Sequence, residues 1–463
     1  MLPTKIVVIG AGSAIFGLNT LGALMRSERL RGSRLTLVDQ NAGALEAMRT
    51  LAERLNREWS AKMTITAHTH HRAALPDAAF VVSAIEVPPR EKLWRSDFEL
   101  TLKYGIRQPY AENGGPGGFF HLARNAAPVL EIVKDMEQAC PDAWFINFTN
   151  PMIRICDLIH RYSQIKVIGL CHQIFAGYGM VGYLLADRLG IQIPPGPFAT
   201  HADPKFWNNL DLISSQAVKR VDIKAAGLNH FTWIMDLRDR HTGEDLYSYL
   251  AEAWEKTAPE VEPLTRRVYQ AFGCMPVPGD EHLCEYLPWV TDPLTRPWEK
   301  YDLSLYDWDA AESRRSDGLQ SVEEMGSGKM GIESLQETDS EGALEVIESL
   351  AGAGNLYHLA VNLPNNGQIS NLPPGAIVET PGMLSGMGVL PVTMGALPKG
   401  VAELCRRELA VVRLAVDAAV SGDRRLALQC LLLDPVIRDM DAARGILDDA
   451  LVAYREALPA FWK

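Results

Sequence analysis

Two short pairs of polar residues carry side chains that can hold a metal ion. Cys171 and His172 directly follow an apolar, β-branched run, and Asn229 and His230 follow a second apolar run. A thiolate and an imidazole are ligands for borderline transition metals, and a site with two protein ligands leaves positions open for substrate oxygens. A single histidine is more often a structural residue, so the hypothesis of a divalent metal site depends on both pairs together.

One carboxylate stands where it could act as a general base. Asp280 follows Gly279 and opens a possible helical turn. A carboxylate within reach of a substrate can take a proton from it. The same position is also typical of a helix N-cap, whose oxygen accepts hydrogen bonds from backbone N–H groups, and the sequence alone favours the cap.

The segment 111–120 carries four glycines around Pro116 and ends in two phenylalanines. This composition predicts an irregular, shaped loop before a helix of about residues 122–139. Such a loop, which contains Asn113, can close over a sugar or a phosphate. The alternative is a surface linker, which the two aromatic rings disfavour.

The start of the chain is typical of a dinucleotide-binding turn. The apolar run 6–9 suits a buried parallel strand, and Gly10 and Gly12 let the chain turn tightly toward a pyrophosphate. The third glycine of the usual pattern is replaced by Ile15, so a plain strand-to-helix turn is the alternative. Asp39 closes the next strand, where an acid binds ribose hydroxyls and repels the extra phosphate of NADP. The residues expected at NAD are Gly10, Gly12, Ser13, Ala14, Asp39, Ser83 and Asn147.

These residues need a fold that brings the ends of several strands together. Apolar strands alternate with helical stretches as far as about residue 170, and ligands of such sheets bind beyond the carboxyl ends of the strands. We therefore predict an α/β protein with an N-terminal Rossmann-like, doubly wound parallel sheet in residues 1–195. A C-terminal α+β domain is expected in residues 196–463, as in lactate and malate dehydrogenases. Within it, the polar segment 302–335 is predicted to be an insertion or a mobile segment.

The composition limits the partners of the protein. Its 463 residues exceed what one core usually fills, and the formal net charge of −12 argues against a nucleic acid or an acidic membrane surface. We find no leader segment and no apolar run long enough for a membrane helix, so a cytoplasmic protein is expected. The seven cysteines form no C-x-x-C pair and are predicted to be reduced thiols.

Taken together, the motifs resemble glycoside hydrolase family four, whose members depend on NAD and a divalent metal ion. The resemblance extends over essentially the whole chain, and the matching pieces stand in the family's order. They are GAGS (10–13), GGPGG (114–118), NFTNP (147–151), GLCH (169–172), GLNH (227–230), GDEHLCEYLP (279–288), NNGQISNLPPGAIVETP (365–381) and ALQCLLLDP (427–435).

The resemblance implies a redox route to glycoside cleavage. NAD⁺ takes a hydride from sugar C3, a base removes the proton on C2, the C1 group leaves by elimination, water adds, and the hydride returns. It implies that Cys171 and His230 bind Mn²⁺ or another divalent metal, which stabilises charge on substrate oxygens. Asp280 matches the base, and His172 matches a position that supports the metal site or protonates the leaving group. The implied substrate contacts are Asn150, Asn113, Asn229 and His172.

The motifs also bear on the choice of sugar. The Cys-His pair resembles subgroups that act on non-phosphorylated α-glycosides, and GDEHLCEY resembles members that cleave α-glucuronides and α-galacturonides. Gln173 and Ile174 depart from the commoner continuations of the Cys-His pair, which leaves room for relatives that cleave sulfoquinovosides. The resemblance thus implies an anionic hexose, whose charge needs nearby cations or N–H donors. The cations nearest to the motifs are Lys103, Arg107 and Arg154.

Two other functions stay open at this point. An NAD-dependent sugar or 2-hydroxy acid dehydrogenase would accumulate NADH and would not need Cys171. A catalytically silent sensor would bind sugar and NAD without cleaving a glycoside, but it has no need of a metal and a base. The partner implied is a small-molecule glycoside, and the resemblance and the apolar C-terminal helices imply a homodimer or homotetramer.

Overall fold

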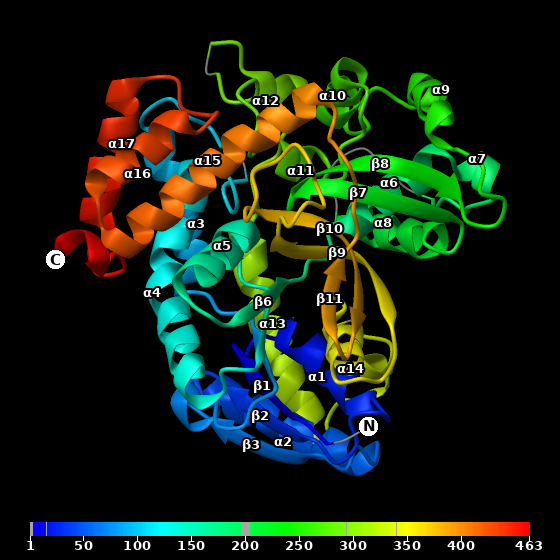
Figure 1. Ribbon diagram of the computed structural model, residues 1–463, viewed down its shortest axis with the longest axis vertical. Coiled ribbons are helices and arrows are strands. Elements are labelled where there is room, and N and C mark those ends of the chain that lie inside the picture. Colours follow the sequence, from blue (N-terminus) through cyan, green and yellow to red (C-terminus); the bar gives the residue numbers. More distant parts are fainter. Residues whose placement is uncertain (1–2, 15, 109, 196–203, 293, 339) are drawn as a thin grey trace.

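Valine- and leucine-rich strands near the N-terminus form the parallel part of one eleven-stranded sheet (Figure 1). The computed structural model describes residues 3–14, 16–108, 110–195, 204–292, 294–338 and 340–463, and of residues 204–207 it describes the backbone. The parallel strands lie in the order β3-β2-β1-β4-β5-β6, which is the order of dinucleotide-binding domains. They are β1 (Lys5–Ile9), β2 (Arg34–Val38), β3 (Thr64–His68), β4 (Phe80–Ser83), β5 (Trp144–Asn147) and β6 (Lys166–Gly169).

The first strand shows why this sequence makes a central strand. Ile6 and Val8 of β1 pack into one hydrophobic core, and Val7 and Ile9 pack into the core on the opposite face. Strands buried on both faces need apolar residues at every position, and β-branched side chains pack well there.

The sheet continues into the C-terminal half through antiparallel strands. Gly169 of β6 pairs with Asn362 of β9, and Glu379 of β10 pairs with Gly227 of β7. These strands are β7 (Val221–Leu228), β8 (Phe231–Asp239), β9 (Leu356–Pro364), β10 (Ile377–Ser385) and β11 (Gly388–Pro391). The expected fold class, a Rossmann-like parallel sheet followed by an α+β part, is confirmed. The predicted boundary after residue 195 adjoins a segment outside the described residues and stays a prediction.

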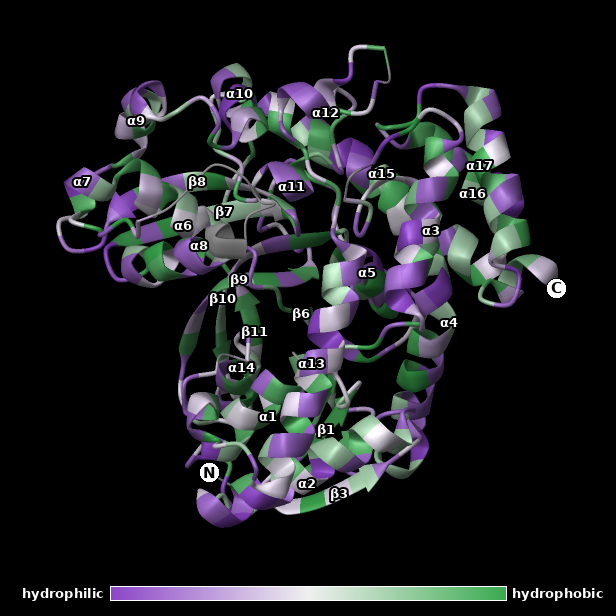
Figure 2. Ribbon diagram, turned by 180° about the vertical axis from the view of Figure 1, so that it is seen from behind, coloured by the Kyte–Doolittle hydropathy of each residue, from purple (hydrophilic) through white to green (hydrophobic). Residues whose placement is uncertain are grey.

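Helices cover both faces of the sheet, and a group of C-terminal helices packs along α4 and α5 (Figure 1). In Figure 2, hydrophilic and hydrophobic residues alternate along peripheral helices such as α4 and α17, as expected for helices with one face on the core. In the first half the helices are α1 (Phe16–Arg26), α2 (Ala42–Glu58), α3 (Arg90–Leu102), α4 (Gly115–Ala139), α5 (Met152–Tyr162), α6 (Ile174–Leu184) and α7 (Ala186–Leu189). In the second half they are α8 (Pro204–Ala217), α9 (Leu250–Lys256), α10 (Pro263–Phe272), α11 (Asp280–Leu283), α12 (Pro297–Lys300), α13 (Trp308–Ser327), α14 (Ala343–Leu350), α15 (Lys399–Ser421), α16 (Arg424–Leu433) and α17 (Met440–Ala453).

Two general expectations can be compared with the structure directly. Within the described ranges, no helix is long and apolar enough to cross a membrane. All seven cysteines are free thiols, six of them buried and Cys171 partly exposed, as predicted for reduced residues.

Residues 302–335 were predicted to be an insertion or a mobile segment; the prediction of a mobile segment was wrong for most of its length, and the insertion stays a prediction. Residues 308–327 form α13, which packs against α2 of the nucleotide-binding half. Val322 and Met325 are buried in the core that α2 shares with the sheet. The segment looks polar because only one face of α13 is buried, and a helix of this kind needs few apolar residues.

The prediction of an irregular loop through residues 111–120 was also wrong, because α4 begins at Gly115. The glycines allow close approach to the preceding segment. A Cβ atom on Gly117 would lie 2.5 Å from the carbonyl oxygen of Ala111, and one on Gly118 would lie 2.4 Å from that of Asn113. Pro116 suits the first turn of a helix, where its missing N–H would have no partner.

Candidate active site

The two predicted metal ligands come from distant parts of the chain and meet in the structure. Cys171 follows β6, and His230 occupies the tight turn between β7 and β8 with a positive φ of 59°. The Sγ atom of Cys171 lies 3.3 Å from Nε2 of His230. Zinc-type bond lengths of about 2.3 Å to sulfur and about 2.1 Å to nitrogen would place two ligand atoms at roughly this separation. The pair therefore fits one divalent metal ion.

The ionisation of this pair suits a metal as well. Burial lowers the pKa of His230 well below its usual value, so the ring is neutral, as a metal ligand must be. Nδ1 of His230 is buried without a hydrogen-bond partner. Burial and the nearby Glu379 carboxylate raise the pKa of the Cys171 thiol, and a bound cation is what would favour the thiolate.

Hydrogen bonds from neighbouring segments hold His230 in its turn. The side-chain oxygen of Gln173 accepts from the backbone N–H of His230 at 3.1 Å and from the hydroxyl of Thr232 at 3.2 Å. Asn229 donates its side-chain amide to the buried Glu379 at 2.7 Å. The structure thus gives Asn229 a role in the turn, and its predicted substrate contact stays a prediction.

A second histidine lies against the first and was missed by the sequence reasoning. The ring of His282 stacks on His230 with centroids 4.0 Å apart. Nδ1 of His282 lies 2.9 Å from Oε1 of Glu285, whose side chain is completely buried. Burial alone would lower the pKa of His282, but the Glu285 carboxylate raises it. One ligand atom from each of these three residues can come within 4.8 Å of the others, so they could also hold a cation.

Glu285 also connects this region to the start of α4. Its Oε2 atom accepts from the backbone N–H groups of Asn113 at 2.6 Å and Gly114 at 3.0 Å. Oδ1 of Asn113 is buried without a partner, beside the site but outside the pocket lining described below. The only sequence signal for Glu285 is its spacing from His282, one helical turn apart, which is a weak signal by itself.

The predicted base, Asp280, lies at the first position of α11 and is buried. Its two carboxylate oxygens accept from the backbone N–H groups of Leu264 at 2.9 Å and Thr265 at 2.6 Å. Asp280 therefore caps α10, and the capping interpretation holds for a different helix from the one expected. Burial and the neighbouring Glu262 carboxylate raise the pKa of Asp280 well above its usual value. Its role as a base stays a prediction.

The other predicted catalytic and substrate residues are placed as follows. His172 lies at the pocket with an exposed side chain, and its Nδ1 is 3.0 Å from Oε2 of Glu341. Asn150 is half-buried in the turn between β5 and α5, before a cis peptide bond to Pro151. Asn147 is buried, and both of its polar atoms bond the backbone of Thr149 in the same turn. Its predicted contact with the cofactor stays a prediction.

The nucleotide-binding turn has the geometry that a dinucleotide needs. Gly10 has a φ of +84°, and a Cβ atom there would lie 2.3 Å from the carbonyl oxygen of Ala84. The backbone N–H of Gly12 donates to Asp39 at 2.8 Å, which places the acid at the turn. Ser83 is buried at the end of β4, and its hydroxyl has no partner. A close-fitting backbone with an unpaired hydroxyl beside it fits a bound pyrophosphate. Ser13 and Ala14 lie within the same turn.

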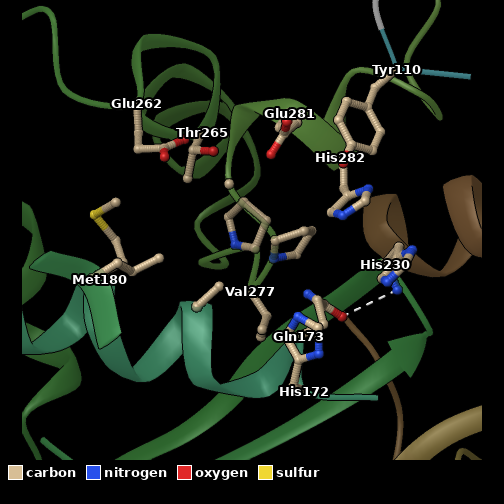
Figure 3. A pocket seen from close by; sticks show the side chains of 15 residues that line it. Tyr110, His172, Gln173, Met180, His230, Glu262, Thr265, Val277, Glu281 and His282 are labelled. Atoms are coloured by element: carbon tan, nitrogen blue, oxygen red, sulfur yellow. Dashed lines mark hydrogen bonds between the residues drawn. The ribbon is translucent and has the colours of Figure 1, made fainter. Parts of the chain in front are cut away.

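A cavity of about 260 Å³ opens beside the metal pair (Figure 3). Figure 3 shows His230, His282 and Tyr110 at one end and Met180, Glu262 and Thr265 at the other, with Val277 between them. The polar lining near the metal pair consists of Tyr110, His172, Gln173, His230, Glu281 and His282. Among the described lining residues there are two glutamates and no lysine or arginine.

The three cations suggested by the sequence do not line this pocket. Arg154 is completely buried and pairs with Glu408 at 3.1 Å. The guanidinium of Arg107 lies over the ring of Trp298, and Lys103 has a largely exposed side chain. None of these three side chains is therefore among the described residues that line this pocket.

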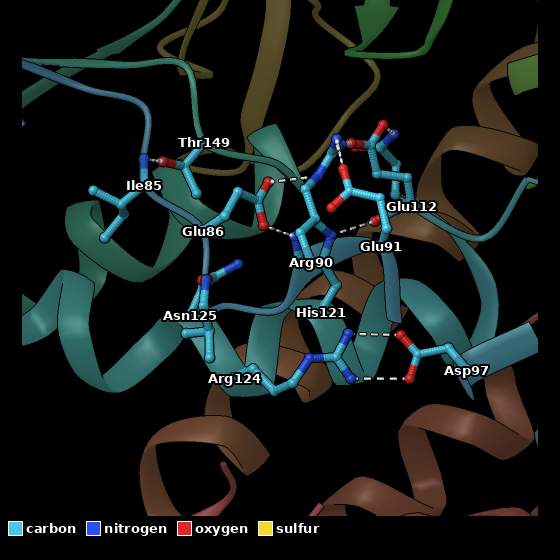
Figure 4. A network of polar contacts seen from close by, with 12 residues as sticks. Ile85, Glu86, Arg90, Glu91, Asp97, Glu112, His121, Arg124, Asn125 and Thr149 are labelled. Carbon is cyan, nitrogen blue, oxygen red and sulfur yellow. Dashed lines mark hydrogen bonds and ion pairs between the residues drawn. The ribbon is translucent and has the colours of Figure 1, made fainter. Parts of the chain in front are cut away.

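A network of ion pairs joins the segment after β4, α3 and α4 (Figure 4). Nε2 of His121 lies 2.7 Å from Glu86, and Arg90 donates to Glu112 at 2.5 Å. Burial would raise the pKa of Glu86, but His121 and Arg90 lower it to about 2. This network connects the segment after β4 with Glu112, the residue just before Asn113.

Comparison with known proteins confirms the class that the fold and the site define. Residues 5–185 match the model of the family 4 glycosyl hydrolases, and residues 225–437 match the model of the C-terminal domain of the same family. The chain belongs to family 4 of the glycosyl hydrolases and is a glycosidase. The predicted use of NAD and a divalent metal ion agrees with this family.

The similar proteins act on several sugars. The chain is 29% identical to an α-glucosidase of Erwinia rhapontici over 96% of this chain and 97% of that protein. It is 28% identical to an α-galacturonidase of Bacillus subtilis over 96% of each. The structure of lplD from Bacillus subtilis, assigned as a glucosidase, superposes with a TM-score of 0.81 at 26% identity, covering 96% of this chain and 99% of that one. A 6-phospho-β-glucosidase from Thermotoga maritima, solved with manganese, NAD⁺ and glucose-6-phosphate, shares the fold with a TM-score of 0.76 at 22% identity, over 98% and 99% of the two chains.

Proposed function

We propose that this glycosidase cleaves α-glycosides with the help of NAD and a divalent metal ion, by oxidation at C3 and elimination across C1 and C2. The observation that carries the proposal is the 3.3 Å separation of Cys171 Sγ and His230 Nε2, where His230 lines the pocket. A thiolate and a neutral imidazole suit Mn²⁺ or a similar ion with positions left for sugar oxygens.

The chain's own residues would prepare this reaction in distinct ways. When bound, the metal supplies a Lewis acid for the C2 and C3 oxygens, and NAD accepts and returns the hydride. Gln173 fixes the turn that presents His230. His172 and Glu281 line the pocket where a proton must leave C2 and another must reach the departing oxygen. The carboxylate of Asp280 accepts hydrogen bonds from two backbone N–H groups of α10. It would have to lose these capping bonds in order to act as the base in this pocket.

The charge of the cleaved sugar is a separate question. The motifs imply an anionic hexose, a uronide or a sulfoquinovoside. A carboxylate or sulfonate in this pocket would face Glu262 and Glu281 without a lysine or arginine among the described lining residues. Since like charges repel, these described lining residues support an uncharged hexose.

A labelling experiment tests the proposal. The protein is incubated in D₂O with NAD⁺ and Mn²⁺ and with aryl α-glucoside, α-galactoside, α-glucuronide, α-galacturonide and α-sulfoquinovoside. We expect cleavage of a neutral glycoside, with deuterium at C2 of the released sugar by NMR and no net NADH. Cleavage of the anionic glycosides alone would contradict the uncharged sugar. NADH build-up with a free sugar or hydroxy acid, and no cleavage, would favour the dehydrogenase alternative.

The cytoplasmic location and the homodimer or homotetramer stay predictions. One surface of the structure would suit contacts between subunits of such an oligomer. Met387 and Leu390, in and beside β11, have exposed fractions of 97% and 66%, and exposed apolar side chains at a sheet edge are typical of contacts between subunits. Sedimentation of the purified protein would measure the number of subunits directly.

A further inference from the structure

The two strands that carry the proposed metal ligands are not neighbours in the sheet. β9 and β10 lie between β6, which Cys171 follows, and β7, which precedes His230. One row of paired residues crosses all four strands and consists of Gly169, Asn362, Glu379 and Gly227. Because glycines stand at both ends of this row, its side chains come from Asn362 and Glu379, between the ends of the two ligand-bearing strands.

The carboxylate of Glu379 in this row is buried among neutral groups. The residue is 1% exposed, and its Oε2 atom accepts from Nδ2 of Asn229 at 2.7 Å and from Nδ2 of Asn362 at 2.8 Å. Among the described residues, these two amides stabilise its charge and no cationic side chain does. A buried carboxylate without an opposite charge is costly, so proteins usually pair it with a cation or a metal ion. Glu379 therefore indicates that a cation binds nearby.

Asn229 connects this carboxylate to the proposed metal ligand. Its amide has two N–H groups, and besides its bond to Glu379 the side chain forms a hydrogen bond with Cys171. The charged groups that act on the Cys171 thiol are the carboxylates of Glu379 and Glu341, and both disfavour a thiolate. A divalent ion at Cys171 and His230 would make this concentration of negative charge favourable.

We propose that Glu379 is a positioning residue for the metal ion: it holds Asn229 against Cys171, and its charge offsets part of the charge of the ion. The inference rests on the proposed function, in which Cys171 and His230 bind the metal. A carboxylate that is one hydrogen-bonded residue away from a ligand orients that ligand and increases metal affinity. A divalent ion, a thiolate, a neutral imidazole and the Glu379 carboxylate together carry no net charge, which suits a centre in the protein interior.

The variant Glu379→Gln tests this role, because it keeps the size of the side chain and an oxygen that can accept from both amides but removes the charge. The dissociation constant of Mn²⁺ is measured by calorimetric titration of the NAD⁺-bound protein without substrate, and Cys171→Ser identifies binding elsewhere. We expect Mn²⁺ to bind about 10–100-fold more weakly to Glu379→Gln, with NAD⁺ affinity unchanged. Glu408→Gln changes another buried carboxylate, which pairs with Arg154, and is the matched control that should keep the wild-type Mn²⁺ affinity.

A second variant decides the question if Glu379→Gln does not fold. Asn229→Ala keeps the carboxylate but removes the amide that connects it to Cys171. We expect this variant to bind Mn²⁺ at least about tenfold more weakly than the wild-type protein. The wild-type Mn²⁺ affinity in Asn229→Ala would then overturn the proposal.

The outcomes separate this inference from the proposed function. An unchanged Mn²⁺ affinity in Glu379→Gln would overturn the positioning role, while a metal site that depends on Cys171 stands. Equal losses of Mn²⁺ and NAD⁺ affinity would also overturn it, because they would indicate general damage to the fold. If the wild-type protein shows no Mn²⁺ binding that Cys171→Ser abolishes, the metal site of the proposed function fails, and this inference fails with it.

Discussion

Nδ1 of His282 lies 2.9 Å from Oε1 of Glu285, and the ring of His282 stacks on His230. A carboxylate that solvent does not reach thus orients an imidazole against the proposed metal ligand. The other oxygen of Glu285 holds the backbone that leads into α4. One side chain therefore fixes both a wall of the pocket and the glycine-rich helix start.

Glu285→Gln should damage both functions of this residue. The amide can offer its oxygen to the two backbone N–H groups, but its NH₂ group then faces Nδ1 of His282 and forces the other tautomer. Loss of charge-assisted hydrogen bonds in a buried place costs about 1–3 kcal/mol, to be measured as the free energy of unfolding in urea. We also expect a fall in kcat that exceeds any rise in KM. Glu403→Gln, on an exposed part of α15, is the control, and equal behaviour of the two variants would contradict this role.

Cys171→Ser should abolish metal-dependent activity. A hydroxyl binds a borderline metal far more weakly than a thiolate, so we expect at least about 100-fold lower turnover at a fixed Mn²⁺ concentration. NAD affinity, measured by calorimetry, should stay nearly the same because the nucleotide turn is made by other residues. Cys140→Ser, at the end of α4, should retain turnover. Unchanged turnover of the Cys171 variant would rule out the metal assignment.

Gly118→Ala should destabilise the protein even though alanine favours a helix. The added Cβ atom would lie 2.4 Å from the carbonyl oxygen of Asn113, so the segment before α4 has to move. Overpacking of this kind costs about 1–3 kcal/mol in the free energy of unfolding. Gly43→Ala in the first turn of α2 is the control, because its Cβ atom meets nothing closer than 3.5 Å. A Gly118 variant as stable as the Gly43 variant would contradict the close packing.

The raised pKa of the buried Glu408 carboxyl group should make the free energy of unfolding depend on pH. Burial raises its pKa to about 7, although Arg154 lies 3.1 Å away. Because the folded-state pKa exceeds the unfolded value of about 4.3, the contribution to stability is complete below pH 4 and is lost as the pH rises toward 7. The stability of the wild-type protein relative to Glu408→Gln should therefore fall by up to about 3 kcal/mol between pH 4 and pH 8. Urea unfolding at both pH values measures this, and a constant difference would contradict it.

The sequence pattern predicted the sheet and the positions of the two polar pairs at strand ends for the same physical reason, and the resemblance to the family then singled out Cys171 and His230 as metal ligands. Strands buried on both faces need continuous apolar runs, and ligands of parallel sheets lie at the ends of such runs, so Cys171 could be placed from local pattern alone. His230 follows a run of the same kind. The observed order β3-β2-β1-β4-β5-β6 is the one typical of the dinucleotide-binding domains that the glycine turn predicted.

Features that depend on distant packing could not be predicted in this way. Whether Gly117 and Gly118 belong to a loop or to a helix depends on what lies against them, and only the folded chain supplies that. Asp280 caps α10, which lies earlier in the sequence. A sequence pattern for helix caps considers only the residues that follow the cap, so it could not predict this partner. The roles of His282 and Glu285 depend on their contacts with His230 and Asn113, which are distant in the sequence.

The continuity of the sheet has a mechanical consequence. β6, β9, β10 and β7 are hydrogen-bonded neighbours, and the buried carboxylate of Glu379 ties Asn229 and Asn362 together at this junction. The nucleotide turn and the glycoside pocket thus adjoin the same continuous sheet. Moving them apart would break backbone hydrogen bonds of about 0.5–1.5 kcal/mol each. Such a frame suits a cofactor that stays bound and is regenerated within every catalytic cycle, as the proposed function requires of NAD, better than a cosubstrate that is exchanged after each one.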